Sequence, residues 1–126
     1  MTTLTNYIGT KIVGAMPEAA SNGAEGYRIV YADGYTSWSP KEAFEQAYRK
    51  TDAMTFGDAL VMLLRGCDVQ RASRSRVKVR LVHPVKPDGP PASFISFPVE
   101  WKHAQQYTIY TPSIDDMLAE DWQVVE

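Results

Sequence analysis

The stretch Arg74-Ser75-Arg76-Val77-Lys78-Val79-Arg80-Leu81 has the clearest strand pattern in the chain. Its even-numbered positions are basic, and its odd-numbered positions from Val77 onward are apolar. A period of two residues places the charges on one face of a strand and the hydrophobic side chains on the other. The pattern therefore predicts a strand over residues 74–81 whose apolar face covers a core.

Helices and further strands are expected on both sides of this stretch. Thr55 caps a predicted helix, with Asp58 at the capping-box position, an apolar face that includes Leu64, and Gly66 at its end. The segment 83–91 holds four prolines and is expected to be a loop. The remaining expected elements are strands over 69–71, 93–101, 106–110 and 122–125, a tight turn near 103–104, and a helix over about 114–119 whose Met117 and Leu118 join Trp122 in the core.

The first fifty residues predict a second, smaller module. Asp33-Gly34 indicates a hairpin turn between strands over 27–31 and 35–38. The other expected elements are a strand over 7–15, a loop over 16–26 and a helix that ends near Lys50. Ser39 is expected to cap this helix, with Pro40 at its first position and Glu42 closing the capping box. Its apolar stripe consists of Ala43, Phe44, Ala47 and Tyr48. We therefore expect an α+β protein of two modules, residues 1–50 and 51–126, each with a small antiparallel sheet and short helices. Because each is small, we expect them to pack intimately or to oligomerise.

Composition limits the classes of function. The 126 residues are 44% hydrophobic and 22% charged, with a net charge of −2, as in ordinary soluble proteins. The balanced total argues against coating of long nucleic acid. No apolar run approaches the roughly 20 residues of a membrane span, and the N-terminus lacks the features of a signal peptide. We expect a cytoplasmic protein without a membrane partner.

Catalytic and metal-binding patterns are weak. The single Cys67 excludes an internal disulfide and a multi-cysteine zinc site. The only histidines, His83 and His103, have no metal-ligand spacing to a partner. The acidic pairs Asp115-Asp116 and Glu120-Asp121 stand beside a helix start, where acids favour the helix dipole more readily than catalysis. We expect no enzyme activity, no metal and no cofactor.

The basic stretch has two interpretations. It is either a solvated strand face, protected from aggregation by its charge, or a surface that binds an anion, because guanidinium groups grip phosphates in a bidentate manner. In the second case neutral donors and aromatic rings for stacking a base would come from Ser73, Ser75, Thr111, Tyr107, Tyr110 and Trp101, although Trp101 is favoured as core. Two similar strand-to-helix junctions, Trp38-Ser39-Pro40 and Tyr110-Thr111-Pro112, are either ordinary helix starts or anion-binding helix N-termini.

Three motifs mark residues 54–125. They are the opener Met54-Thr55-Phe56-Gly57-Asp58-Ala59-Leu60, Gly66 with the strand Val69-Gln70-Arg71, and the closing motif from Tyr110-Thr111-Pro112-Ser113 to Asp116-Met117-Leu118-Ala119-Glu120-Asp121-Trp122. With these motifs, the segment resembles the second Thoeris anti-defence family, small phage proteins that sequester cyclic nucleotide-type immune signals without degrading them. Residues 7–44 resemble a segment common in uncharacterised phage proteins, with Tyr35, Trp38 and Lys41 as its ligand candidates.

The resemblance implies a site and a partner. In that family the ligand lies between protomers of an oligomer, and an aromatic residue after the first strand commonly grips its base; here that position is Arg74. The ligand-binding residues that the resemblance implies are Arg71, Arg74, Tyr110, Thr111 and Ser113. The patterns above add Arg76, Tyr107, Trp38 and Ser39 as candidates. The expected function is a homo-oligomeric sponge, a dimer or tetramer in the host cytoplasm, for a cyclic ADP-ribose isomer or a cyclic oligonucleotide. The alternative is a phage protein-interaction module that inhibits a host protein.

Overall fold

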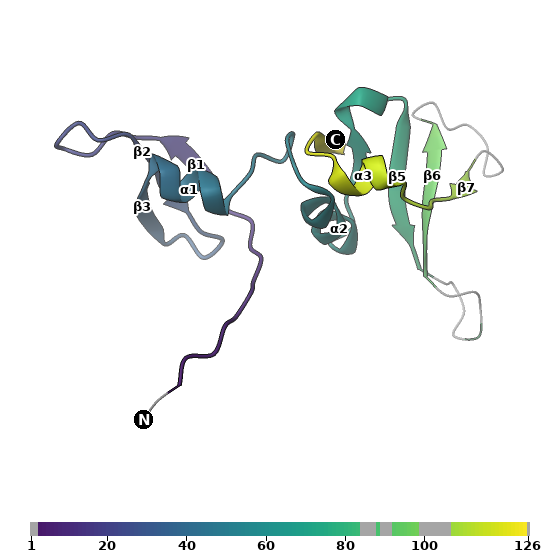
Figure 1. Ribbon diagram of the computed structural model, residues 1–126, viewed down its shortest axis with the longest axis horizontal. Helices are drawn as coiled ribbons and strands as arrows, with labels where there is room; N and C mark the ends of the chain where they lie inside the picture. Colours follow the sequence, from purple (N-terminus) through teal and green to yellow (C-terminus); the bar gives the residue numbers. More distant parts are fainter. Residues whose placement is uncertain (1–2, 84–87, 89–91, 99–106, 126) are drawn as a thin grey trace. The chain divides into compact units, whose positions relative to one another are not determined.

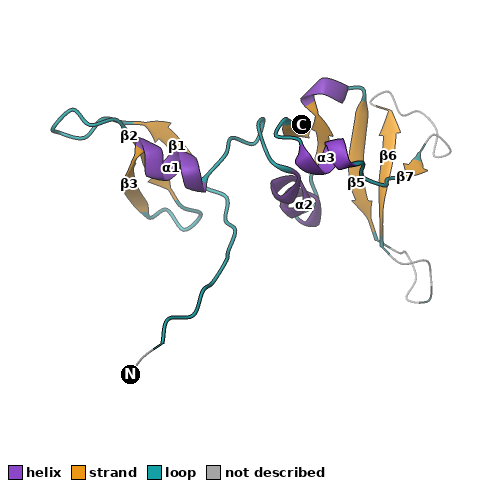
Figure 2. Cartoon of the chain, viewed as in Figure 1, coloured by secondary structure: helices purple, strands orange, loops and turns teal. Residues whose placement is uncertain are grey.

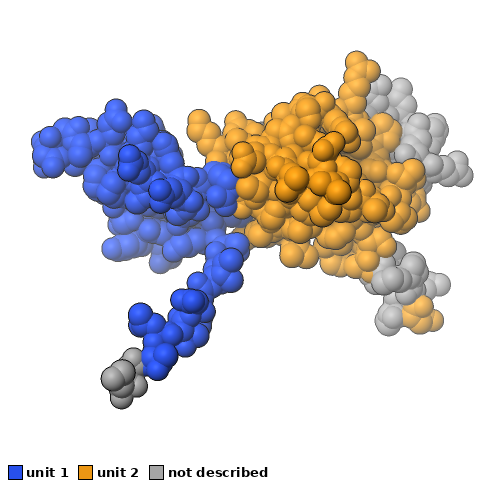
Figure 3. Space-filling model, viewed as in Figure 1, with its two compact units in different colours: residues 1–49 blue, residues 50–126 orange. Residues whose placement is uncertain are grey.

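The computed structural model describes residues 3–83, 88, 92–98 and 107–125. The chain forms two compact units, Met1–Arg49 (unit 1) and Lys50–Glu126 (unit 2) (Figure 3). Each unit has one small antiparallel sheet accompanied by short helices (Figure 2). The predicted α+β class is confirmed.

Unit 1 is a three-stranded sheet with one helix. It contains β1 (Gly14–Pro17), β2 (Gly26–Val30), β3 (Thr36–Pro40) and α1 (Lys41–Ala47), with the strands in the order β1-β2-β3 (Figure 1). The predicted turn joins β2 to β3: Gly34 has a φ of 89°, and the Tyr35 N–H donates to Asp33 Oδ1 at 3.0 Å. A φ in this region suits glycine, so the Asp33-Gly34 pair was sufficient to predict the turn.

Aromatic rings join α1 to the sheet. The Phe44 ring stacks on Tyr27 of β2 with centroids 4.4 Å apart, and Tyr48 stacks on Phe44 at 4.9 Å. Ala43 and Ala47 are exposed, so the predicted apolar stripe of α1 is narrower than expected. The large rings, not the alanines, cover this face of the sheet.

Trp38 lies on its own sheet rather than pointing freely into solvent. A Cβ atom on Gly26 would stand 2.3 Å from the Trp38 ring, so the indole rests directly on the glycine backbone. The indole Nε1–H donates to the carbonyl oxygen of Glu18 at 2.8 Å. These two contacts fix the ring on unit 1.

Three expectations for unit 1 are wrong: the start of the first strand, the cap of the helix and the end of the helix. The first strand begins at Gly14, not at residue 7, because β2 ends at Val30, which lies opposite Gly14 in the register. Tyr7 and Ile8 are exposed. Ser39 does not cap α1. It pairs within the sheet, Pro40 occupies the cap position without a side-chain bond, and the helix ends at Ala47.

Unit 2 is a five-stranded sheet with two α-helices, one before the first strand and one between the last two strands. Its elements are α2 (Phe56–Leu64), β4 (Asp68–Arg71), the short 3-10 helix η1 (Ala72–Arg74), β5 (Val77–Val82), β6 (Ser93–Pro98), β7 (Thr108–Ile109), α3 (Ile114–Leu118) and β8 (Trp122–Val125). The strand order is β7-β6-β5-β4-β8, and every neighbouring pair is antiparallel.

The core of unit 2 lies between α2 and one face of this sheet. Its buried members are Met54, Ala59, Leu63, Val69, Val79 and Trp122. The capping box of Thr55 with Asp58 and the positive φ of Gly66, 92°, confirm the predicted start and end of α2. Leu64, Met117 and Leu118 are exposed, contrary to expectation. The five-residue α3 turns Asp116, not its apolar side chains, toward the core.

The predicted strand over 74–81 is divided. Arg74 belongs to η1, and β5 starts only at Val77. Because β5 pairs antiparallel with β4 at Val69↔Val79, the chain must reverse over the intervening residues. Arg74 and Arg76 therefore do not continue the strand face that carries Lys78 and Arg80, and Arg80 forms a two-pronged ion pair with Asp68.

The last strand is joined to the start of the unit. Backbone bonds run from Met54 N–H to Trp122 O at 2.8 Å, from Trp122 N–H to Met54 O at 3.1 Å, and from Val124 N–H to Thr51 O at 2.9 Å. β8 is thus held on one side by β4 and on the other by residues 51–54. Trp101, His103, the turn near 103–104 and most of the loop over 83–91 lie outside the described residues.

Candidate functional site

Asp116 is the centre of a polar cluster in unit 2. It is the only charged side chain of the described residues that is buried. Its carboxylate accepts from the Tyr110 hydroxyl at 2.9 Å, the Ser113 N–H at 3.2 Å and Arg71 Nη1 at 3.3 Å. The Ser113 hydroxyl accepts from the Asp116 N–H at 3.0 Å, which completes a capping box at the start of α3. Local sequence thus positions this carboxylate.

Arg71 connects the cluster to Asp121. The Arg71 Nε donates to Asp121 Oδ1 at 2.9 Å, and Asp121 also accepts from the Ser73 N–H at 3.0 Å and, through its backbone oxygen, from the Ala72 N–H at 2.9 Å. The guanidinium, at the end of β4, is therefore bonded to two carboxylates that follow in the sequence about fifty residues later. These bonds fix the end of β4 against the segment after α3.

The surroundings shift the protonation equilibria of the cluster. Burial acts to raise the pKa of Asp116, but hydrogen bonds from Ser113, Tyr110 and Arg71 outweigh it, and the pKa is lowered. The pKa of Asp121 is likewise lowered, because bonds from Arg71 and Ser73 outweigh its burial. Burial and the neighbouring Asp116 raise the pKa of the Tyr110 hydroxyl. The cluster is thus an ionised carboxylate pair held by a cation and a neutral phenol.

Acid is expected to destabilise unit 2 through these two carboxylates. A carboxylate whose pKa is lower in the folded state stabilises the fold above its unfolded pKa, and that contribution disappears as the pH falls through the folded value. We expect the free energy of unfolding to decline below about pH 5. Urea titrations followed by tryptophan fluorescence between pH 3 and 7 measure this. In Asp121→Asn the decline should be shallower, and an equally steep decline would contradict the assignment.

Arg74 is the cation of the cluster that remains accessible. Its side chain is 61% exposed, and its Nη1 lies 3.8 Å from Asp116 Oδ1, beyond hydrogen-bond length. Ser75 and Arg76 follow it and are exposed. The anchored pair of Arg71 and Asp116 therefore holds a loop whose basic side chains face solvent.

The structure brings only some of the predicted site residues together. Arg71, Arg74, Tyr110 and Ser113 all surround Asp116. Thr111 and Tyr107 are exposed, Arg76 lies after η1, and Trp38 and Ser39 belong to unit 1. Because Ser39 is not a helix cap, the predicted likeness between the two strand-to-helix junctions fails.

Tyr110 contacts both the core and the polar cluster. The ring meets Trp122 edge-on, with centroids 6.5 Å apart at 81°, and its hydroxyl is bonded to Asp116. No sequence pattern indicates that Asp121 holds Arg71, since the two are fifty residues apart. The Ser113-x-x-Asp116 spacing is a capping-box pattern, and the structure contains this capping box.

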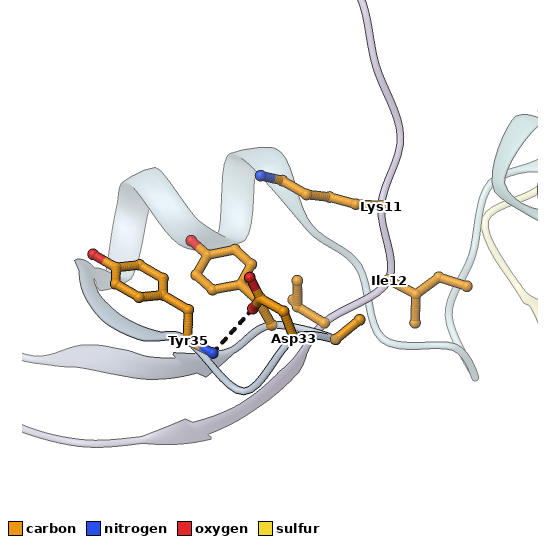
Figure 4. Close-up of a pocket in the computed structure, with 7 residues that line it drawn as sticks. Lys11, Ile12, Asp33 and Tyr35 are labelled. Atoms are coloured by element: carbon orange, nitrogen blue, oxygen red, sulfur yellow. Dashed lines mark hydrogen bonds between the residues drawn. The ribbon is translucent and has the colours of Figure 1, made fainter.

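A concave feature of the surface belongs to unit 1. A shallow pocket of about 560 Å³ is lined by Lys11, Ile12, Val13, Tyr31, Ala32, Asp33 and Tyr35 (Figure 4). It lies against the β2–β3 turn, next to the segment that leads into β1. The sequence indicated Tyr35 as a ligand candidate but not Lys11 or Tyr31.

Comparison with known families decides the identity of unit 2. A family model described as the Thoeris anti-defense 2-like domain matches residues 54–125. The chain belongs to this family. The Thoeris anti-defense 2-like domain covers the elements from α2 to β8, so the Asp116 cluster lies within it and the pocket of unit 1 lies outside it. Membership supports a phage anti-defence role. A search of curated proteins found no match.

Two other features are relevant to a chain of this kind, a membrane-spanning helix and a metal site. In the described ranges, no helix is long and apolar enough to cross a membrane. Over the same residues, no group of three or more histidine, cysteine, aspartate or glutamate side chains is arranged to hold a metal ion.

Proposed function

We propose that the protein binds and sequesters a cyclic nucleotide-type immune signal, a cyclic ADP-ribose isomer or a cyclic oligonucleotide, without cleaving it. The observation that carries the proposal is the Thoeris anti-defense 2-like domain over residues 54–125. Sequestration requires tight binding and no reacting group. The hydrogen bonds of the Asp116 cluster provide a fixed support for the accessible Arg74. The expected effect is that an effector of bacterial defence is deprived of its signal.

The proposed roles differ within the cluster. Arg74 and Arg76 contact phosphate groups, since their guanidinium groups are exposed and planar. Ser75 and Thr111 add neutral donors, and the exposed Tyr107 offers a ring to a base. Ser73 is already bonded to Asp121 and helps to position the loop. Arg71, Tyr110 and Ser113 are positioning residues, because Asp116 and Asp121 already occupy their polar atoms.

Arg74→Ala is expected to weaken binding of the signal by about tenfold or more, because a hydrogen bond to a charged group contributes roughly 1.5–3 kcal/mol. The matched control is Arg65→Ala, which removes another exposed arginine at the end of α2. Calorimetric titration of both variants with the ligand that stabilises the wild-type protein measures the difference. Equal affinities for the two variants would count against this site.

The ligand itself is found by a thermal-shift screen of cyclic ADP-ribose isomers and cyclic di- and trinucleotides. A ligand present at a hundredfold excess over its Kd stabilises the folded state by about 2.7 kcal/mol. Chromatography of the ligand released by heating then tests the chemistry. Intact ligand supports sequestration, whereas cleaved ligand would make the protein an enzyme.

We also propose a homo-oligomer, a dimer or tetramer. The apolar side chains of α3, Ile114, Met117 and Leu118, are exposed, with Leu118 at 77%, and Leu64 of the neighbouring α2 is 70% exposed. Large apolar side chains gathered in this way are typical of a surface that another protein covers. A second copy of the chain would cover them and bring two sets of basic loops into one assembly.

The same apolar side chains favour a second candidate function, a phage protein-interaction module that inhibits a host protein. Light scattering of the purified protein separates the two candidates. An oligomer together with a thermal shift supports the sponge. A monomer that no cyclic nucleotide stabilises supports the interaction module.

A further inference from the structure

The pocket of unit 1 combines an ammonium group, two phenol rings and a carboxylate. Lys11 comes from the segment before β1, and Tyr31, Asp33 and Tyr35 come from the β2–β3 turn (Figure 4). The pocket is shallow and open to solvent, with a volume of about 560 Å³, so a ligand would lie on its surface and stay partly exposed. This combination of groups limits the kinds of ligand that the pocket can bind.

The ammonium group favours an anionic ligand. Lys11 Nζ lies over the Tyr31 ring, 5.0 Å from its centroid. No ion pair of Lys11 with a carboxylate occurs among the residues that the structure describes, although Asp33 also lines the pocket. A cationic ligand would have to displace Lys11 from this ring, whereas a phosphate would gain an ion pair from it.

The two phenol rings favour a planar group in the ligand. The Tyr31 and Tyr35 rings stack with centroids 5.7 Å apart and planes at 27°. A hydrogen bond between the Tyr31 hydroxyl and Ser37 Oγ, 3.0 Å long, holds Tyr31 in place. Tyr35 is 66% exposed, so a flat ring can extend the stack at little cost in protein rearrangement. Bases stack on aromatic side chains in this way whatever their sequence.

Asp33 adds a polar contact. Its Oδ1 accepts from the Tyr35 N–H at 3.0 Å and thereby fixes the turn. A carboxylate has a second oxygen and further lone pairs, which can accept from an exocyclic amino group or from a ribose hydroxyl. An unsubstituted aromatic acid offers neither of these donors, and a nucleotide offers both.

We infer that this pocket is a second ligand site, specific for a free mononucleotide. The base stacks on Tyr35, the phosphate pairs with Lys11, and Asp33 accepts from the base or the ribose. This site lies in unit 1, outside the Thoeris anti-defense 2-like domain, and it does not depend on the cluster around Asp116. The chain would then hold nucleotides at two places of different kinds.

The test is a calorimetric titration of the full chain with adenosine 5′-monophosphate, with adenosine and inorganic phosphate as separate probes. We expect saturable binding of the mononucleotide and weaker binding of each part. Tyr35→Ala should weaken it about tenfold, as loss of one stacked base implies. Lys11→Ala should weaken it about fivefold at low salt, as loss of one exposed ion pair implies, and should reduce the salt dependence.

Matched controls separate a binding effect from a folding effect. Tyr35→Phe retains the ring and should bind within about twofold of wild type, since stacking needs only the ring. Tyr7→Ala and Lys50→Ala remove exposed side chains outside the pocket lining and should leave binding unchanged. Circular dichroism melts confirm that each variant is folded.

Three outcomes would overturn the inference. The first is no binding of adenosine 5′-monophosphate at millimolar concentration, and the second is an affinity of Lys11→Ala and Tyr35→Ala equal to that of the wild type. The third is equal affinity of the wild type for adenosine and for the mononucleotide. Arg74→Ala distinguishes the two sites. Mononucleotide binding that survives Arg74→Ala supports the pocket even if no cyclic nucleotide binds unit 2. Mononucleotide binding that Arg74→Ala abolishes would assign it to unit 2 and end the proposal for unit 1.

Discussion

Asp116→Ala is expected to destabilise unit 2 by about 3 kcal/mol, because the Tyr110 hydroxyl loses its acceptor and Arg71 loses one of its two carboxylates, and each such loss costs roughly 1–3 kcal/mol. The variant removes the acceptor of the Tyr110 hydroxyl and the Ser113 N–H, and it leaves Arg71 with Asp121 alone. The matched control is Asp115→Ala, which removes an exposed acid from the same turn of α3. That change should cost less than about 1 kcal/mol.

Urea unfolding followed by fluorescence measures both variants, since the buried Trp122 reports on the core of unit 2. The midpoint of the unfolding transition should fall clearly for Asp116→Ala and hardly at all for Asp115→Ala. If the two midpoints fell by the same amount, Asp116 would be an ordinary helix-start acid and the polar cluster would contribute little.

Trp122→Ala is expected to cost about 3–5 kcal/mol, the usual loss when a buried tryptophan is truncated. The Trp122 residue is 2% exposed. Its ring packs on Phe56 with centroids 5.6 Å apart, and its Nε1–H donates to the backbone oxygen of Asp116 at 2.9 Å. Because the indole joins α2, α3 and the sheet, its loss leaves a cavity where all three meet.

Trp122→Phe is the comparison that separates packing from hydrogen bonding. Phenylalanine keeps part of the ring contact and loses the bond to Asp116, so we expect roughly half of the full loss. Far-ultraviolet circular dichroism during thermal unfolding measures both variants without relying on this tryptophan. A loss below about 1 kcal/mol for Trp122→Ala would show that the core collapses around the missing ring.

Local sequence signals predicted the ends of α2 and the turn between β2 and β3, where hydrogen bonds between neighbouring residues determine the structure. Thr55 with Asp58 and Gly66 define both ends of α2, and the Asp33-Gly34 turn is formed as predicted. Each of these depends on hydrogen bonds within a few residues or on a backbone angle that glycine favours. Residues 122–125 form the predicted last strand.

The two misplaced strand starts have a common cause in long-range pairing. Residues 7–13 have a strand-like composition, but β2 ends at Val30, opposite Gly14, so the register begins at Gly14. The basic alternation suggested one strand from Arg74, whereas pairing of Val69 with Val79 requires the chain to reverse before Val77. Sequence patterns report which residues can form a strand and not which strand lies beside them.

The resemblance grouped Arg71, Arg74, Tyr110 and Ser113, and the structure places these four residues around one carboxylate. Their role in ligand binding stays a prediction, and their geometry could not be predicted from the sequence. The pairing of Arg71 with Asp121 spans fifty residues, and no spacing rule predicts it. The result changes the expected role of Arg71, whose guanidinium is bonded to acids, while Arg74 stays accessible.

The position of β8 affects how the protein is made. In the described part of the chain, Thr51 and Met54, at the start of unit 2, form their backbone bonds with β8. These bonds can form only after Val124 has left the ribosome, although domains generally fold as the chain is synthesised. The strand pairs of the unit 1 sheet lie within residues 14–40, so that sheet can form while most of unit 2 is still being synthesised.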